Sequence, residues 1–275
     1  MYSHRGLGNE YLKALSKSLK VSSHVKELSL SQNRLTNNGV VPLLKSLLEN
    51  KKLVKNLNIL NFSYNKLGES AINNLCLYMK EKECDLMALN LEANVLGNHL
   101  CSLVIKTITD ELSHKFTLLN LAQNNINDQI CDLIADLLEK CGRLQVLVLY
   151  WNFIKNYGGS LIMNKAKNHP RLKVLDISWN RLGSNLLDEP TKEEMERDYQ
   201  DKEKTKNFYN AELNEIRSFM ELGSKKKLKP LKSSVSLFTK ELCELFKNVN
   251  NEVVHLDISH NNLNYIDCCQ ISNHF

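Results

Sequence analysis

The sequence predicts an α/β solenoid: short parallel strands line a concave face, helices cover the convex face, and one charged helical insertion interrupts the array. Three observations predict this fold. The eleven-residue pattern LxxLxLxxNxL, with Val, Ile or Phe allowed for Leu, recurs seven times. Apolar residues at helical spacing fill the segments between the copies. The asparagines of successive copies are 32, 29, 30, 28, 28 and 81 residues apart, so only the last interval is anomalous.

The LxLxx part of each copy predicts a short strand whose alternate leucines point inward. The asparagine that follows it carries an amide that can bond to backbone groups of the neighbouring turn, which would otherwise be buried without partners. Stacked in register, these residues should form a ladder with a structural role. The predicted asparagine ladder consists of Asn33, Asn65, Asn94, Asn124, Asn152, Asn180 and Asn261.

The segments between the strands predict one helix for each repeat. The helical spacing is clearest at Val40, Leu43, Leu44, Leu47 and Leu48, and again at Cys131, Ile134, Ala135 and Leu138. Cys101, Cys131 and Cys268 each lie seven positions after their repeat's asparagine, where a small buried residue is expected. We therefore predict a structural role for these cysteines, with a metal or redox role as the alternative.

Residues 188–232 are predicted to be an insertion within the sixth repeat of a single domain covering residues 1–275. Residues 188–203 hold eight acids and three bases, whereas residues 204–232 hold eight bases and three acids. Tyr209, Leu213, Ile216 and Met220 recur at steps of four, three and four, which predicts one face of a helix. Two interpretations stay open: a solvated arm without a partner, and a docking arm.

Helices are also expected on either side of the repeats that the pattern defines. Residues 6–20 predict a helix without its strand, and residues 261–275 begin a final helix. After the insertion, a helix is predicted over residues 236–248. Its core-facing residues would be Leu237, Leu242, Leu245 and Phe246.

A repeat of 28 residues with a full helix resembles the ribonuclease-inhibitor subclass of leucine-rich repeats, and the resemblance covers almost the whole chain. A second resemblance rests on fewer residues. Tyr150-Trp151-Asn152 and Ser178-Trp179-Asn180, with Gly158-Gly159 between them, are similar to leucine-rich repeats of ciliary and flagellar proteins. This second resemblance implies a structural component of the axoneme.

The exposed strand positions beside the inward leucines are expected to line the concave face. The residue before each asparagine should belong to one row: Gln32, Tyr64, Ala93, Gln123, Trp151, Trp179 and His260. The two tryptophans would be roughly 5 Å apart at strand spacing, and exposed aromatic residues are typical of interface hot spots. The predicted protein-binding residues are Tyr64, Tyr150, Trp151, Asp176, Trp179, Asp257 and His260. The alternative is that the tryptophans only cover the backbone of the neighbouring turn.

Composition and motifs argue against catalysis, cofactors, nucleic acid and membranes. The 36 basic and 31 acidic residues leave a net charge of only +5. The sequence has no HExxH or HxxxH pair, no GxxxxGK[ST] loop, no GxSxG elbow and no GxGxxG motif. His255, Asp257 and His260 would be close together, but without a nucleophile. We expect eight reduced cysteines and, in the absence of a long apolar stretch or signal core, a cytoplasmic location.

These features together predict a non-catalytic scaffold that binds other proteins through its concave face and its insertion, as part of a multi-protein cytoskeletal complex of the cilium. Two alternatives stay open. The Ran GTPase-activating proteins share the repeat subclass but typically carry a strongly acidic segment after the repeats, which is absent here. An adaptor or sensor repeat module is the other alternative, and fold alone cannot separate the three.

Overall fold

The structure is a computed structural model, and it describes residues 6–183 and 235–274. The chain divides into two units, one formed by Met1–Asn185 with Val235–Phe275 and the other by Leu186–Ser234. The second unit lies outside the described residues, and so do the predicted insertion and its helix-face residues Tyr209, Leu213, Ile216 and Met220. The first unit contains all of the elements described below.

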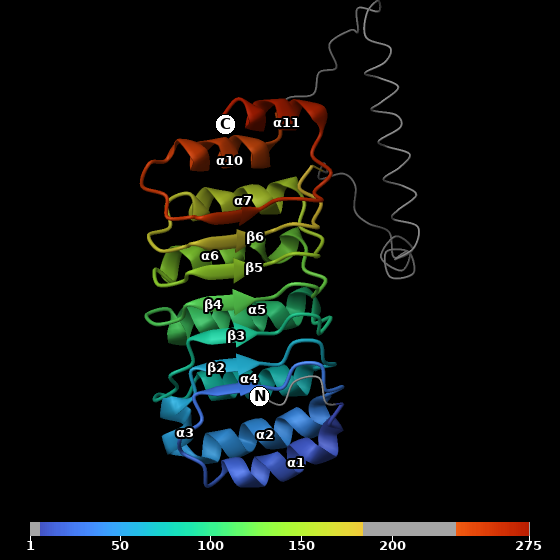
Figure 1. Ribbon diagram of the computed structural model, residues 1–275, viewed down its shortest axis with the longest axis vertical. Helices are drawn as coiled ribbons and strands as arrows, with labels where there is room; N and C mark the ends of the chain where they lie inside the picture. Colours follow the sequence, from blue (N-terminus) through green and yellow to red (C-terminus); the bar gives the residue numbers. More distant parts are fainter. Residues whose placement is uncertain (1–5, 184–234, 275) are drawn as a thin grey trace, which may run out of the picture. The chain divides into compact units, whose positions relative to one another are not determined.

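Seven parallel strands form one sheet in which each strand pairs with the next one along the chain (Figure 1). They are β1 (Glu27–Ser29), β2 (Ile59–Asn61), β3 (Ala88–Asn90), β4 (Leu118–Asn120), β5 (Val146–Val148), β6 (Val174–Asp176) and β7 (His255–Asp257). Equivalent positions of the repeats are partners throughout: Leu28 pairs with Leu60 at one end and Leu175 with Leu256 at the other. The predicted α/β solenoid is thereby confirmed.

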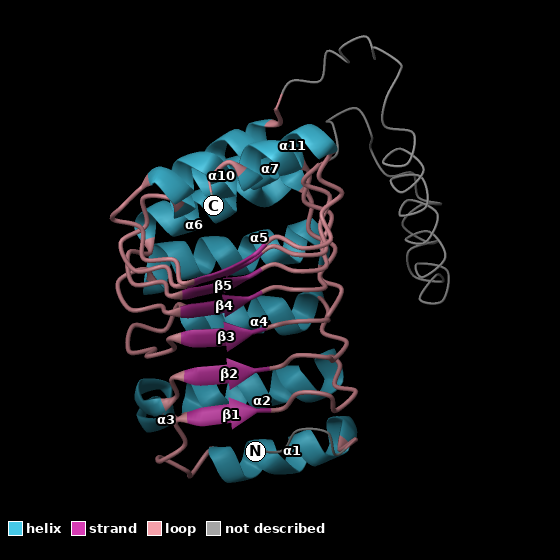
Figure 2. Ribbon diagram, turned by 45° about the horizontal axis from the view of Figure 1, so that its top comes forward, coloured by secondary structure: helices cyan, strands magenta, loops and turns pink. Residues whose placement is uncertain are grey.

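The described helices lie on one side of the sheet, and none of them covers its other side, which we call the strand face (Figure 2). They are α1 (Gly8–Leu19), α2 (Asn37–Glu49), α3 (Lys51–Asn56), α4 (Glu69–Met79), α5 (Gly97–Thr107), α6 (Cys131–Lys140), α7 (Asn156–Ala166), α10 (Leu237–Lys247) and α11 (Tyr265–Ser272), together with a π-helical turn (Ile108–Leu112) and a 3-10 turn (Asp128–Ile130). Within the described ranges, no helix combines the length and the apolar character needed to cross a membrane.

The core between sheet and helices is mainly aliphatic. The central leucines of β1 to β6 are buried, as are the leucines on the inner face of α2. Leu256 of the edge strand β7 is only partly buried, whereas Leu28 of β1, the other edge strand, is buried. Burial of aliphatic side chains therefore supplies the main favourable term of folding, and it weakens toward β7.

The ladder asparagines connect consecutive repeats through buried hydrogen bonds. The Oδ1 atom of Asn152 accepts from the backbone N–H groups of Asn124 (3.1 Å) and Ile126 (2.9 Å). Its Nδ2 group donates to the carbonyls of Leu121 (3.1 Å) and Leu149 (2.8 Å). One amide thus satisfies buried backbone groups on two neighbouring turns, which agrees with the expected chemistry of this position.

The same bonds continue across the break at residues 184–234. The Oδ1 atom of Asn261 accepts from the N–H groups of Asn180 (3.1 Å) and Leu182 (3.4 Å), although Asn180 lies 81 residues earlier. The N–H of Gly183 also donates to the carbonyl of Asn261 at 2.9 Å. The seventh copy of the pattern therefore stacks on the sixth in the register shared by the other copies.

A second row of polar side chains joins the helix starts and was missed in the sequence. It occupies the fourth position after several of the ladder asparagines. Asn37 accepts from the N–H groups of Gly68 and Ala71, and Asp128 accepts from those of Lys155 and Gly158. These acceptors serve N–H groups near a helix start, which have no partner within their own helix. The recurrence of Asn or Asp at this spacing was the available signal.

Two expectations about packing were wrong. Leu237 is 46% exposed, and the neighbouring Phe238 is fully buried in its place. The helix begins at Leu237 with Ser236 as its N-cap, so Leu237 lies on the outer face of the first turn. Cys268, predicted to be buried, is exposed, whereas Cys101 and Cys131 at the equivalent position are fully buried. In the described array no further helix covers α11, which leaves Cys268 in solvent.

Candidate functional site

The residue before each ladder asparagine lies in a turn beyond the strand, so the prediction that these are strand positions was wrong. All seven residues have φ between 53° and 55°, a left-handed conformation that costs a non-glycine residue about 1 kcal/mol. Two kinds of hydrogen bond hold these turns: one to the backbone of the next repeat and one through the ladder asparagine that follows. The N–H of Trp151, for example, donates to the Ser178 carbonyl of the next repeat at 3.0 Å, while Asn152 turns into the ladder.

Trp151, Trp179 and His260 form a continuous stack on successive turns, here called the aromatic stack. The ring centroids of the two tryptophans are 4.9 Å apart with planes inclined by 18°, in agreement with the expected strand spacing. The centroids of Trp179 and His260 are 3.8 Å apart, with planes inclined by 22°. Trp151 keeps 43% and Trp179 keeps 37% of its surface exposed. The rings thus present a broad, laterally supported aromatic surface to solvent.

Tyr64 and Tyr150, predicted to join the tryptophans, instead converge on the carboxylate of Glu92. Both hydroxyls donate to Glu92 Oε1, from Tyr64 at 2.6 Å, and Asn120 donates to Glu92 Oε2 at 3.1 Å. Burial, together with the hydrogen bond to this carboxylate, raises the pKa of Tyr64 and that of Tyr150 above the ordinary tyrosine value. The tyrosines therefore remain protonated donors, and this Glu92 network ties β2, β3, β4 and β5 together.

Glu92 was not among the predicted site residues. It lies two positions after β3, in a row where the other repeats carry Ser, Ala or Tyr. A single charged residue in such a row was the signal available in the sequence. What the sequence could not show is that side chains from separate repeats meet at this carboxylate, because the register of the strands brings them together.

Asp176 and Asp257 occupy paired positions on adjacent strands, so the residues between them in the chain do not separate them in space. In each, Oδ1 accepts the N–H of the serine two residues later, at 3.1 Å for Asp176 and 2.9 Å for Asp257. Burial raises the pKa of Asp257, but the bonds from Ser259 and the proximity of His255 and His260 lower it by more, so the net shift is downward. Two carboxylates thus lie side by side on the strand face.

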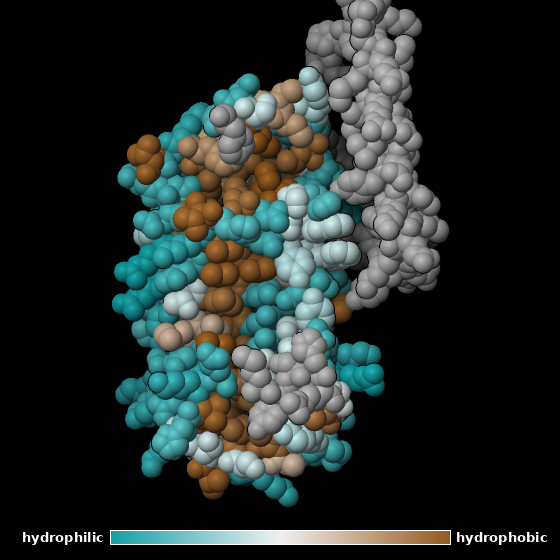
Figure 3. Space-filling model, in the orientation of Figure 1, coloured by the Kyte–Doolittle hydropathy of each residue, from teal (hydrophilic) through white to brown (hydrophobic). Residues whose placement is uncertain are grey.

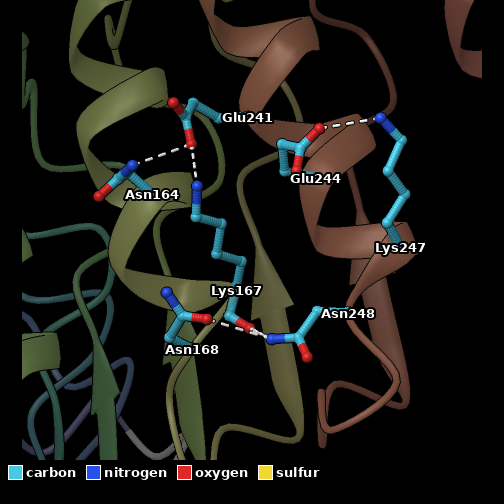
Figure 4. Close-up of polar contacts among 7 residues, drawn as sticks. All are labelled: Asn164, Lys167, Asn168, Glu241, Glu244, Lys247 and Asn248. Carbon is cyan, nitrogen blue, oxygen red and sulfur yellow. Dashed lines mark hydrogen bonds and ion pairs between the residues drawn. The ribbon is translucent and has the colours of Figure 1, made fainter.

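On the helix side, a shallow hollow of about 220 Å³ lies between α7 and α10. Figure 4 shows that its charged groups are already engaged with one another. Lys167 pairs with Glu241 at 2.7 Å, and Lys247 pairs with Glu244 at 2.9 Å. Asn248 also donates to the Lys167 carbonyl at 2.5 Å. The bonds of Lys167 to Glu241 and Asn248 join the ends of α7 and α10, whereas the Lys247–Glu244 pair lies within α10, and a structural role accounts for all three.

The thiols of Cys101 and Cys141 are buried in the core and have packing roles. Burial raises the pKa of the Cys101 thiol and that of the Cys141 thiol to about 12, so both are protonated and unreactive near neutral pH. Within residues 6–183 and 235–274, no group of three or more His, Cys, Asp or Glu side chains could hold a metal ion.

Buried His169 gives a pH-dependent stability that can be measured. Its Nδ1 accepts the N–H groups of Arg171 (3.1 Å) and Leu172 (2.8 Å), while Nε2 faces the Cys141 carbonyl at 3.1 Å. Burial lowers the pKa of His169, although the bond to Cys141 opposes that effect. At a pH below the ordinary histidine pKa, His169 therefore binds a proton more readily in the unfolded chain than in the folded chain. The free energy of unfolding should be highest above about pH 6.5 and fall as the pH drops below that value.

His169→Asn is the matched variant for that measurement. Asn50 already performs the same task in an earlier repeat, accepting the N–H of Leu53 and donating to the carbonyl of Leu19. Denaturant titrations between pH 5 and 8 should give a flatter stability profile for His169→Asn, with little change at pH 8. An unchanged slope would show that other groups carry the pH dependence.

Comparisons with known proteins agree with this architecture. The family model described as Leucine Rich repeat matches residues 21–44, around β1, and 168–185, around β6. Two mouse proteins, "NACHT, LRR and PYD domains-containing protein 9C" and "9B", are 27% and 24% identical over 56% and 57% of this chain. The match spans about a fifth of the length of these relatives, 20% and 21%.

Among solved structures, the leucine-rich repeat domain of LRIM1 matches with 20% identity over 65% of this chain and 60% of that one, at a TM-score of 0.28. That score is too low for a detailed comparison of the two folds. The repeat pattern, the register of the seven strands and the family match agree with one another. The chain therefore folds as a leucine-rich-repeat solenoid.

Proposed function

We propose that this chain is a non-catalytic scaffold that binds other proteins through the strand face and the aromatic stack. Leucine-rich repeats generally mediate protein–protein interaction. The observation that carries the proposal is the stack of Trp151, Trp179 and His260, because exposed and mutually supported aromatic rings are what binding hot spots require. The Glu92 network beside it fixes four neighbouring strands, which keeps the surface preorganised.

The experiment that tests this proposal is partner capture with Trp151→Ala/Trp179→Ala. We expect this double variant to weaken capture of the native partner by about 2–4 kcal/mol, because it removes the centre of a hot spot. Capture is measured by pull-down from the native source followed by titration of the recovered protein. Leu77→Ala/Tyr157→Ala removes two exposed apolar side chains elsewhere on the array, and it should bind like the parent chain. Equal capture by both double variants would rule out the stack as the binding site.

We further propose that the partner belongs to a cytoskeletal assembly of the cilium or flagellum and that residues 188–232 form a second docking arm. The similarity of residues 150–152 and 178–180 to axonemal leucine-rich repeats, within the ribonuclease-inhibitor-like subclass, supports the first part. The separation of acidic from basic residues in the insertion supports the second. A fluorescent fusion should localise to the cilium, and deleting residues 190–230 should lose one class of captured protein. Diffuse localisation would contradict the ciliary assembly, and an unchanged set of captured proteins would contradict the docking arm.

An assay of GTP hydrolysis tests the competing hypothesis that this chain regulates a small GTPase. A scaffold should leave the rate of GTP hydrolysis by a Ran-type GTPase unchanged, whereas a GTPase-activating protein accelerates it by several orders of magnitude. Clear acceleration would replace the scaffold proposal.

A further inference from the structure

The strand face carries an apolar stripe that crosses several repeats. The first residue of each strand from β2 to β6 is apolar, and we define the apolar stripe by these residues: Ile59, Ala88, Leu118, Val146 and Val174. They are neighbours through the strand pairing, and four of the five keep part of their surface accessible. Figure 3 shows a hydrophobic band running along this face. A continuous apolar band of this kind marks an interaction surface more often than scattered apolar residues do.

Between the first residue of each strand and its ladder asparagine, the charged side chains other than histidine are all acidic. From β1 to β7 these positions carry four carboxylates, those of Glu27, Glu92, Asp176 and Asp257. Basic residues stand only next to these positions: Lys26 and Lys173 directly precede β1 and β6, and Arg34, Lys66 and Arg181 directly follow ladder asparagines. The chain as a whole has 36 basic residues against 31 acidic ones, so the absence of Lys and Arg from these positions is a local property. The face is therefore complementary to a positively charged partner.

Asp176 and Asp257 concentrate this charge beside one end of the stripe. Their Cα atoms are partners in the sheet, and like charges on directly paired positions destabilise a sheet. Within the described ranges, neither carboxylate forms an ion pair, and each uses Oδ1 to accept a local backbone N–H. His255 and His260 lie near Asp257 and favour its charged form. A Lys or Arg side chain of a partner would complement both carboxylates.

The spacing of the stripe favours a helical partner over an extended one. Neighbouring parallel strands lie about 4.8 Å apart, so the five stripe residues span roughly 19 Å. An α-helix repeats every 5.4 Å, and about 13 of its residues would cover this length. Side chains on one face of an extended strand recur only about every 6.6 Å, and they lose register with the stripe after one or two repeats.

We propose that the partner bound at the strand face contributes an amphipathic α-helix with an apolar side and basic flanks, which lies along the apolar stripe with Lys or Arg side chains at Asp176 and Asp257. This inference rests on the proposed scaffold function and adds the chemistry of the occupant. In this complex the apolar stripe supplies most of the affinity, and the aspartate pair determines which partner binds and in which direction its helix runs.

The test uses two 16-residue synthetic helical peptides with the same leucine face, one with lysine at every polar position and one with glutamate. Because Trp151 and Trp179 are the only tryptophans and lie on this side, their fluorescence can report binding. We expect the lysine peptide to bind the parent chain at least tenfold more tightly than the glutamate peptide. Asp176→Asn/Asp257→Asn should weaken the lysine peptide about fivefold, and less so at high salt.

Two further variants separate the alternatives. Val146→Thr/Val174→Thr keeps β-branched residues in the strands and should weaken the lysine peptide by removing apolar surface. Asp132→Asn/Asp136→Asn makes the same change in net charge on the exposed side of α6 and should have no effect. An equal loss of affinity for the lysine peptide in both aspartate variants would mean that only the net charge of the protein matters, and it would overturn the proposal. Equal affinity of the parent chain for the two peptides would overturn it as well. In either case, capture that depends on Trp151 and Trp179 would leave the scaffold function standing.

Discussion

Asn152→Ala is expected to lower the free energy of unfolding by about 2–5 kcal/mol. The substitution removes the Oδ1 acceptor of two buried N–H groups, those of Asn124 and Ile126, and the donor to two carbonyls. Each buried group left without a partner costs about 1–3 kcal/mol. Because the bonds connect neighbouring repeats, the loss should reduce the coupling between them as well as the total stability. Chemical denaturation followed by circular dichroism measures both, through the midpoint and the slope of the transition.

Asn73→Ala is the control for that experiment. Asn73 is exposed on α4 and lies outside the ladder, and alanine favours the helix more than asparagine does. This variant should therefore be neutral or slightly stabilised. If Asn152→Ala matched it, the ladder would contribute nothing measurable and the hydrogen bonds assigned to it would lose their significance.

Gly183→Ala should dislodge the last described repeat. A Cβ atom at this position would lie 1.8 Å from the carbonyl oxygen of Asn262 and 2.9 Å from the Cα of Leu263. Both are backbone atoms, so the turn after β7 has to move. That movement strains the bonds of Asn261 to Asn180, Leu182 and Gly183, and we expect a local cost of about 3 kcal/mol.

Hydrogen exchange locates this effect. The amides of residues 253–272 should exchange faster in Gly183→Ala, while those of β2 to β5 keep their protection. Gly142→Ala is the matched control, because its Cβ would meet only the Pro170 side chain at 3.8 Å, an ordinary contact. Faster exchange throughout the array in Gly183→Ala would mean that the last repeat does not open on its own.

Most of the fold could be predicted because the same pattern of inward leucines and a terminal asparagine occurs seven times in the sequence. The period of two fixes which leucines of each strand face inward, and the asparagine at a constant offset fixes where the strand ends. Leu237 and Cys268 show where this reasoning stops. Leu242 and Leu245 of the predicted helix face are buried, but in the first turn Phe238 takes the inward position in place of Leu237. Burial at the last helix depends on what covers it.

The candidate site was predictable only in part. Equal offsets from the asparagines placed Trp151, Trp179 and His260 in one row, and they do stack. The same argument grouped Tyr64 with them, and Tyr150 was placed beside the two tryptophans, whereas both hydroxyls bond to Glu92. The distance in sequence from the ladder asparagine shows which repeat position a residue occupies. It does not show where a long side chain ends, because such a side chain can reach an acceptor in another repeat. The left-handed turn also went unseen, because non-glycine residues rarely adopt it and no glycine marks it.

The contact between Trp179 and His260 tests the account most directly, because it requires the array to continue in register past residues 184–234. The carbon-bound ring protons of His260, observed by NMR, should be shifted upfield by the Trp179 indole 3.8 Å away. The shift should disappear in Trp179→Leu and persist in Tyr157→Ala. Ring protons of His260 at the positions of an unstructured histidine would contradict both the continuous ladder and the binding surface built on it.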